Sequence, residues 1–283
     1  MKKVSVIGAG IMGSDVALDL ASQGYKVVLI DVSEEKMSQA AESIKKSYQL
    51  MQFIKKEKID LSLDDILKNI QFTTSLKHVI NSNIIIENVT ENWETKETLY
   101  TSLNKFNNEE TLYLVNTSCI SITRVAGLMN YPENVIGAHF MNPVPLKKMV
   151  EVIKGRRTSK ETILKVKDFL KSLDKSAVVV DDFPGFVSNR ILMLTINEAI
   201  WTVQDQVATP SKVDRIFKEG FGHRMGPLET GDLIGLDTIL NSLKVLYEEF
   251  KDPKFRPCPL LVKMVDSGCY GRKTGNGFFK YFN

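Results

Sequence analysis

Hydrophobic positions along the chain occur in two alternating patterns. Short apolar runs, the first at residues 4–7 and the second at 27–30, are separated by longer stretches in which apolar residues recur every three or four positions. Short runs bounded by glycine or polar residues are typical of buried parallel strands, and the periodic stretches are typical of helices. Further runs of the first kind are found at residues 83–87, 112–115, 134–138, 149–153 and 177–180. This order predicts an α/β fold with a doubly wound parallel sheet.

The pattern changes after residue 183. Before that point, the charged segment 33–58 has helical spacing and predicts one long helix or a helical pair between strands. Beyond it the strand-like runs stop, and helices are predicted over segments that include 232–250 and 259–265. We therefore predict two domains, an α/β domain over residues 1–183 and an all-helical C-terminal domain over residues 184–283.

Three glycines join the first predicted strand to the first predicted helix. Gly8, Gly10 and Gly13 form the pattern G-x-G-x-x-G, in which the first allows a tight turn, the second admits a pyrophosphate, and the third permits close packing of helix on strand. Asp31 ends the second strand, where a carboxylate binds the ribose hydroxyls of NAD and repels the 2′-phosphate of NADP. A helix cap is the structural alternative for Asp31. The complete pattern predicts a Rossmann-type domain that binds NAD.

Composition narrows the class of protein. The chain of 283 residues has 37 basic and 34 acidic residues and a net charge of +3, so no surface for nucleic acid is expected. Its three cysteines lack C-x-x-C spacing, which favours neither a metal site nor a disulfide framework and fits a reducing cytoplasm. No run of about eighteen apolar residues could span a membrane, and the first residues do not resemble a signal peptide. We therefore expect a cytoplasmic protein that binds no metal, nucleic acid or membrane.

Polar residues stand at the ends of several predicted strands, where doubly wound sheets bind ligands. They are Glu91, Asn116, Ser118 and His139. Glu151 lies on the strand after His139, and only a short proline-rich loop separates the two. A carboxylate on one ring nitrogen raises the basicity of the other, which can take a hydroxyl proton as hydride leaves for nicotinamide. The pair predicts a general base, and a core histidine with a structural glutamate is the alternative interpretation.

Seven motifs occur in the order found in one known family. Four of them are G-x-G-x-x-G at 8–13, N-T-S at 116–118, H-F-M-N-P at 139–143 and P-G-F-V-S-N-R at 184–190. The other three are M-G-P-L-E at 225–229, I-G-L-D at 234–237 and G-R-K-T-G-N-G-F-F at 271–279. Together they cover essentially the whole chain. The sequence therefore resembles the L-3-hydroxyacyl-CoA dehydrogenases, especially the short-chain 3-hydroxybutyryl-CoA enzymes.

The resemblance implies an NAD-dependent oxidoreductase that interconverts a short 3-hydroxyacyl thioester and its 3-oxoacyl form. It makes His139 the general base, Glu151 its orienting carboxylate, and Ser118 and Asn189 the groups that hold the substrate oxygens. It also implies NAD contacts by Asp31, Glu91, Lys96, Ser118, Asn142 and Lys273. A homodimer formed through the helical domain, which would then serve substrate binding and dimerisation, is implied as well.

The sequence leaves the substrate handle open. Lysines near the end of a long helix meet the CoA phosphates in the family, and Lys55 and Lys56 are the candidates here, although such lysines often form only a solvated surface. Cys119 and Met141 differ from the usual motif and resemble dehydrogenases that act on carrier-bound groups in polyketide extender pathways. We expect a short acyl-CoA substrate. The alternatives are a glyceryl- or hydroxymalonyl-type group on an acyl carrier protein and, in another class, a non-catalytic NAD-binding protein.

Overall fold

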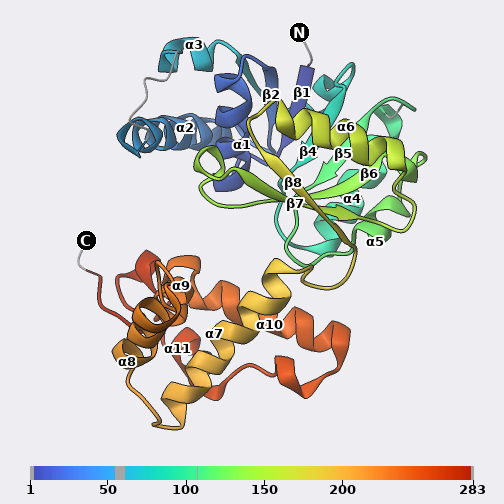
Figure 1. The fold of residues 1–283 in the computed structure, drawn as a ribbon. Helices are drawn as coiled ribbons and strands as arrows, with labels where there is room; N and C mark the ends of the chain where they lie inside the picture. Colours follow the sequence, from blue (N-terminus) through green and yellow to red (C-terminus); the bar gives the residue numbers. More distant parts are fainter. Residues whose placement is uncertain (1–2, 55–60, 107, 282–283) are drawn as a thin grey trace. The chain divides into compact units, whose positions relative to one another are not determined.

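Eight strands form one sheet in the order β3-β2-β1-β4-β5-β6-β7-β8 (Figure 1). The computed structural model describes residues 3–54, 61–106 and 108–281. The strands are β1 Lys3–Ile7, β2 Lys26–Ile30, β3 Ile70–Thr73, β4 Ile84–Glu87, β5 Leu112–Val115, β6 Val135–Phe140, β7 Met149–Lys154 and β8 Ser176–Asp181. Neighbouring strands are parallel except β6 and β7, which are antiparallel. The predicted fold class is thus confirmed, with one antiparallel pair in a mostly parallel sheet.

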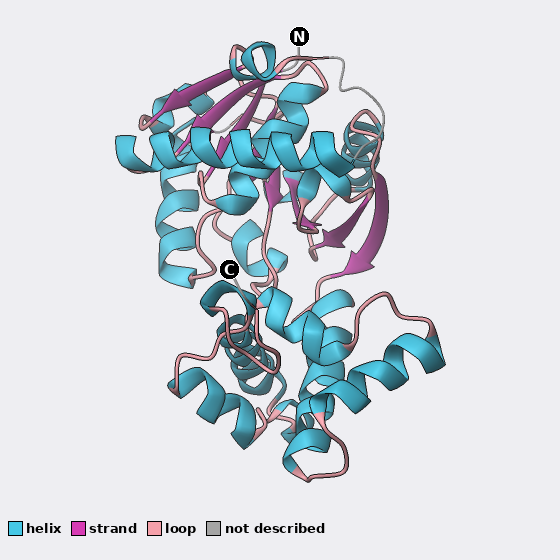
Figure 2. Cartoon of the chain, turned by 90° about the vertical axis from the view of Figure 1, so that its left-hand side faces the viewer, coloured by secondary structure: helices cyan, strands magenta, loops and turns pink. Residues whose placement is uncertain are grey.

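Two compact units divide the chain, Met1–Phe183 and Pro184–Asn283. The helices of the first unit cover both faces of the sheet (Figures 1 and 2). They are α1 Ile11–Ser22, α2 Glu34–Ile54, α3 Leu63–Leu67, α4 Trp93–Leu103, α5 Ile122–Ala126 and α6 Lys160–Lys171. None of the helices in the described part of the chain combines the length and hydropathy needed to cross a bilayer.

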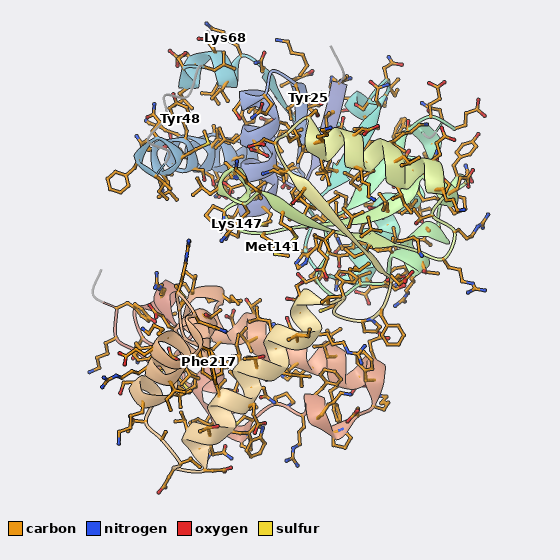
Figure 3. The ribbon with its side chains drawn as sticks, viewed as in Figure 1. Tyr25, Tyr48, Lys68, Met141, Lys147 and Phe217 are labelled. Carbon is orange, nitrogen blue, oxygen red and sulfur yellow. The ribbon has the colours of Figure 1, made fainter. Side chains whose placement is uncertain are left out.

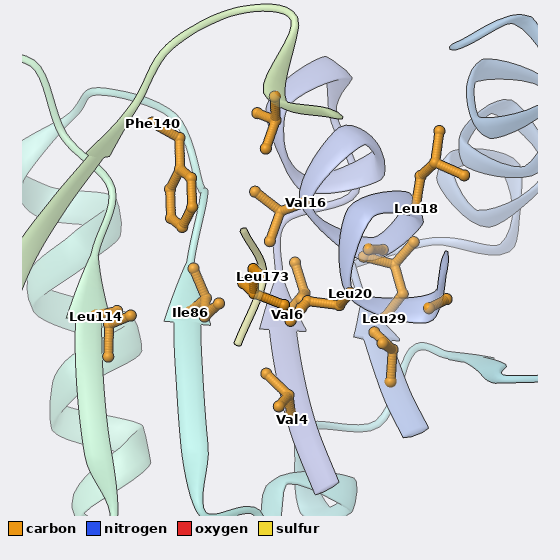
Figure 4. Packing of buried hydrophobic residues seen from close by; sticks show 14 of the residues in the cluster. Val4, Val6, Val16, Leu18, Leu20, Leu29, Ile86, Leu114, Phe140 and Leu173 are labelled. Atoms are coloured by element: carbon orange, nitrogen blue, oxygen red, sulfur yellow. The ribbon is translucent and has the colours of Figure 1, made fainter. Parts of the chain in front are cut away.

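Alternate side chains of the central strands explain the packing of the helices. Val4 and Val6 of β1 and Ile86 of β4 are completely buried in one core with Val16 and Leu20 of α1 (Figure 4). The same core contains Val166, Phe169 and Leu170 of α6. Because successive side chains of a strand point to opposite faces, the intervening residues serve the other face. Each fully buried aliphatic side chain contributes roughly 1.5–3 kcal/mol to this packing.

The second unit is helical and has a separate hydrophobic core. Its helices are α7 Ser188–Gln204, α8 Pro210–Arg215, α9 Pro227–Ile234, α10 Leu236–Phe250 and α11 Pro259–Asp266. The prediction of one helix over residues 232–250 is wrong, because the chain breaks at Gly235 with a φ of +106°. That conformation favours glycine. The N–H of Leu236 then donates to the carbonyl oxygen of Tyr270 at 3.1 Å, a bond that a continuous helix would not allow.

Candidate active site

The glycine turn lies between β1 and α1. Gly8 has a φ of +95°, and a Cβ there would stand 2.5 Å from the backbone oxygen of Asn88. A Cβ on Gly13 would stand 1.7 Å from the carbonyl oxygen of Gly8. At Gly10, by contrast, no other atom lies within 4 Å of the position that a Cβ would take. The turn is therefore closed against β4 and open at the N-terminus of α1, which fits the pyrophosphate of a dinucleotide.

Asp31 follows β2, and its carboxylate faces this turn. Oδ2 accepts a hydrogen bond from the N–H of Ala9 at 2.6 Å, and Oδ1 accepts one from the N–H of Val32 at 2.7 Å. A cavity of about 560 Å³ lies beside the carboxylate, and its walls include Gly8, Asp31, Val32, Thr74, Leu76 and Leu99. A mostly apolar cavity with one carboxylate at its edge suits an adenosine, whose ribose hydroxyls can donate to Asp31.

Glu91 organises the loop after β5. Its Oε1 accepts hydrogen bonds from Oγ1 of Thr117 at 2.5 Å, from the N–H of Ser118 at 2.9 Å and from the N–H of Cys119 at 2.8 Å. Donors that converge on one carboxylate oxygen hold the loop in one conformation. Glu91 therefore positions Ser118, while its direct contact with NAD stays a prediction.

Lys96 lies behind this loop and not at the surface. Its side chain has no exposed surface, and Nζ is 2.7 Å from both carboxylate oxygens of Glu87. Burial raises the pKa of Glu87, and burial together with that carboxylate raises the pKa of Tyr100 well above its usual range. The described geometry does not support the expected contact of Lys96 with NAD, because Glu87 encloses the ammonium. Nζ also donates to the carbonyl oxygen of Asn116 at 3.4 Å, so Lys96 helps to hold the backbone at the end of β5.

Asn116 joins three strand ends. Its Nδ2 donates to Oδ1 of Asn88 after β4 at 2.7 Å, and its Oδ1 accepts from the N–H of Phe140 in β6 at 3.3 Å. The side chain therefore fixes the spacing of β4, β5 and β6 at their carboxyl ends. Asn142 follows β6 and is exposed in the loop towards β7, where Figure 3 labels Met141 and Lys147.

His139 stands opposite Glu151 in the antiparallel pair of β6 and β7. Its Nδ1 lies 3.2 Å from Oε2 of Glu151, and its Nε2 lies 3.3 Å from Oγ of Ser118. The glutamate is buried, whereas 12% of the histidine side chain is exposed. A carboxylate at Nδ1 favours the tautomer with the proton on that nitrogen, so the basic lone pair of the ring is on Nε2, the nitrogen that faces Ser118. The sequence predicts His139 at the end of this strand, and β6 includes it and so places it directly across from its partner.

The other predicted site residues belong to the second unit or lie outside the described residues. Asn189 on α7 and Lys273 belong to the second unit, where Nζ of Lys273 is 2.6 Å from Oδ2 of Asp237. Lys55 and Lys56 lie outside the described residues. Among the residues that the structure describes, no group of three or more His, Cys, Asp or Glu could hold a metal ion.

Sequence reasoning missed two carboxylates that support the site. Glu87 anchors Lys96, and its signal was a charged residue at the end of an apolar strand. Asp182 accepts from Oγ of Ser121 at 2.8 Å and from the N–H of Thr123 at 2.7 Å, which fixes the start of α5. It lies just before the predicted domain boundary at residue 183, and the local sequence gives no sign of that function.

These arrangements define the class of the protein, which is a dinucleotide-dependent dehydrogenase. The turn and Asp31 fit the cofactor, and Nε2 of His139 stands beside Ser118 at the sheet end where a proton must be taken as hydride is transferred.

Comparison with known proteins gives the family. Residues 3–183 match the family model described as 3-hydroxyacyl-CoA dehydrogenase, NAD binding domain, and residues 185–281 match the C-terminal domain of the same family. The chain belongs to the 3-hydroxyacyl-CoA dehydrogenase family. The resemblance inferred from the sequence motifs is thereby confirmed, and so are NAD as the cofactor and dehydrogenase as the class of enzyme.

Relatives and solved structures agree with this assignment. The probable 3-hydroxybutyryl-CoA dehydrogenase of Bacillus subtilis is 42% identical over 282 residues, which cover 99% of this chain and 98% of that protein. The 3-hydroxybutyryl-CoA dehydrogenase of Bradyrhizobium diazoefficiens is 42% identical over 99% of this chain and 96% of its own length. The crystal structure of the (S)-3-hydroxybutyryl-CoA dehydrogenase from Ralstonia eutropha has a TM-score of 0.92 and 37% identity, with 100% of both chains covered.

Proposed function

We propose that the protein interconverts L-3-hydroxybutyryl-CoA and acetoacetyl-CoA with NAD as the hydride carrier. The observation that carries this proposal is the chain of contacts from Glu151 through His139 to Ser118. These contacts place the basic nitrogen of the imidazole beside a hydroxyl group. The names of the relatives, 3-hydroxybutyryl-CoA dehydrogenase, support a short 3-hydroxyacyl substrate.

His139 acts as the general base in this proposal. Its Nε2 takes the proton of the 3-hydroxyl while the hydrogen on C3 leaves as hydride, and Oε2 of Glu151 at Nδ1 stabilises the imidazolium that forms. The hydroxyl group of Ser118 keeps its proton and donates a hydrogen bond to the oxygen on C3. By family resemblance Asn189 holds a second substrate oxygen. Bound NAD supplies the hydride acceptor, and in the reverse direction His139 returns the proton to the new hydroxyl.

The test is the turnover of acetoacetyl-CoA with NADH, followed by NADH absorbance. His139→Gln and Glu151→Gln should each lower kcat by roughly 10²- to 10⁴-fold, the range that general acid–base catalysis provides. Lys154→Met, which removes an ion pair with Asp181 at 2.6 Å, is the control and should keep wild-type turnover. Unchanged kcat in both active-site variants would contradict the assignment.

The handle of the substrate in this proposal is coenzyme A. The test compares kcat/KM for 3-hydroxybutyryl-CoA with kcat/KM for the same acyl group, and for a glyceryl group, loaded on an acyl carrier protein. A much higher kcat/KM for either carrier-bound group would show that the substrate handle is the carrier protein and not coenzyme A. We also propose that the enzyme works in a reducing cytoplasm, since the number and spacing of its three cysteines do not suggest a disulfide framework.

The C-terminal unit is proposed to serve substrate binding and dimerisation. Large apolar side chains lie exposed on it, with Val207 76% and Phe221 67% exposed. The same unit also exposes Ile191, Ile216 and Leu233. Apolar surface of this extent is usually covered by a partner, and a second copy would do so with two-fold symmetry. Light scattering at micromolar concentration should give twice the chain mass, and a monomer mass would refute the dimer.

A further inference from the structure

A buried charged cluster lies outside the residues expected to touch substrate or cofactor. Asp15 and Asp19 are one turn apart on α1, and Lys175 directly precedes β8. Nζ of Lys175 is 3.1 Å from Oδ2 of Asp19, and the two side chains are 3% and 7% exposed. Charged side chains are seldom buried, because leaving water is unfavourable for them. The burial of these three charged side chains therefore indicates a specific structural or functional role.

The cluster holds the loop between β6 and β7. Nζ of Lys175 donates to the carbonyl oxygen of Val144 at 2.7 Å and to that of Lys147 at 2.8 Å (Figure 3 labels Lys147). Oδ2 of Asp15 accepts from the N–H of Val144 at 3.3 Å, and Oδ1 accepts from Oγ of Ser47 at 2.6 Å. The backbone of Val144 is thus bound by a carboxylate on one side and by an ammonium on the other.

The position of this loop links two parts of the site. The loop starts directly after β6, which carries His139, contains Asn142, and leads into β7, which carries Glu151. Asp15 stands two residues after Gly13 on the helix that begins at the glycine turn. Through the cluster, the helix of the cofactor turn and the hairpin of the histidine–glutamate pair are joined by hydrogen bonds.

We propose that Lys175, together with Asp15 and Asp19, is a positioning residue that sets Asn142 and His139 relative to the glycine turn. The inference rests on the proposed function for its effect on turnover, but its effect on NADH binding is independent of the acyl substrate. Misplacement of a reacting group by about 1 Å can lower the rate by 10²-fold, so a loop released from its anchors should act on both quantities.

The test uses a paired substitution. Lys175→Met alone leaves Asp19 buried without its cation and can unfold the protein for that reason. The double variant Asp19→Leu/Lys175→Met removes both charges, keeps apolar volume in their place, and deprives the two loop carbonyls of their donor. The control is Lys148→Met on the same loop, where Nζ pairs with Asp174 at 2.8 Å and both side chains are 78% exposed.

For a folded double variant, the dissociation constant of NADH measured by calorimetry should rise about 10-fold, and kcat should fall by about 10- to 100-fold. KM for the acyl-CoA and the unfolding midpoint should change little, and the Lys148→Met control should match wild type in all four measurements. Binding of NADH and kcat within about twofold of wild type would overturn the inference. An unfolded double variant would overturn it too, because the cluster would then hold the fold. Inactivity of the wild-type protein towards acetoacetyl-CoA would contradict only the proposed function.

Discussion

Alanine at Gly13 should lower stability more than alanine at Gly10, because a Cβ has no room at position 13 and open space at position 10. A Cβ at position 13 would stand 1.7 Å from the carbonyl oxygen of Gly8, so the turn must move by more than an ångström. Overpacking of this kind costs about 1–3 kcal/mol. A Cβ at position 10 would meet no atom within 4 Å. Since this residue is the N-cap of α1, where glycine is mildly preferred over alanine, Gly10→Ala should cost no more than about 1 kcal/mol.

Binding of NADH should be weakened in both variants. The second glycine of the turn lets the backbone approach the pyrophosphate, so a methyl group at position 10 should weaken binding about 10-fold, or by about 1.4 kcal/mol. Denaturant unfolding gives the stabilities, and calorimetry gives the dissociation constants. Gly10→Ala is thus expected to separate binding from stability, and Gly13→Ala to reduce both. Wild-type affinity in Gly10→Ala, or wild-type stability in Gly13→Ala, would refute the reasoning.

Three further predictions concern single side chains. Asp31→Asn should narrow the preference for NADH over NADPH, as kcat/KM for both cofactors will show, and an unchanged ratio would exclude the role of this carboxylate. Burial raises the pKa of the Asp232 carboxyl above its ordinary value of 3.8, so the stability that its protonated form contributes is present below pH 3.8 and is lost as the pH rises. In urea unfolding, the free energy of unfolding of wild type minus that of Asp232→Asn should therefore fall from about pH 4 upward. A difference that rises with pH would contradict this. Ile86→Ala, in the core shown in Figure 4, should cost about 2–5 kcal/mol by the same method, and a loss below about 1 kcal/mol would disagree with complete burial.

The parts of the fold that could be predicted from the sequence are those with local signals. The glycine turn, Asp31 and the order of strands follow from spacing along the chain. The prediction missed β3, an edge strand in which only Ile70 is buried. A strand with so few buried positions has no strong apolar run in its sequence. The helix end at Gly235 was not predicted, because the apolar spacing continues across this residue. Only the hydrogen bond from Leu236 to Tyr270 requires the helix to end there.

Site residues could be predicted where the residue type and its position along the chain determine the function. They could not be predicted where the function depends on contacts with residues far away in the sequence. His139 and Glu151 lie twelve positions apart on neighbouring strands, and a short loop between strands suffices to bring them together. Lys96 has the charge expected of a group that binds phosphate or ribose, but its ammonium group forms a buried ion pair with Glu87. No pattern in the sequence indicates that Lys175 reaches the loop carbonyls, because these contacts join segments about thirty residues apart.

The reversal of chain direction between β6 and β7 has a consequence for how the enzyme can vary. His139 and Glu151 sit on one hairpin of a single unit, so their alignment requires only the closure of a short loop, a step with a modest entropic cost. Proton transfer is therefore encoded in a contiguous stretch of sequence. With substrate binding assigned to the helical unit, as we propose, residues of that unit can change to suit a different acyl group while this hairpin is left as it is. The inheritance of the chemistry is then separate from the inheritance of specificity.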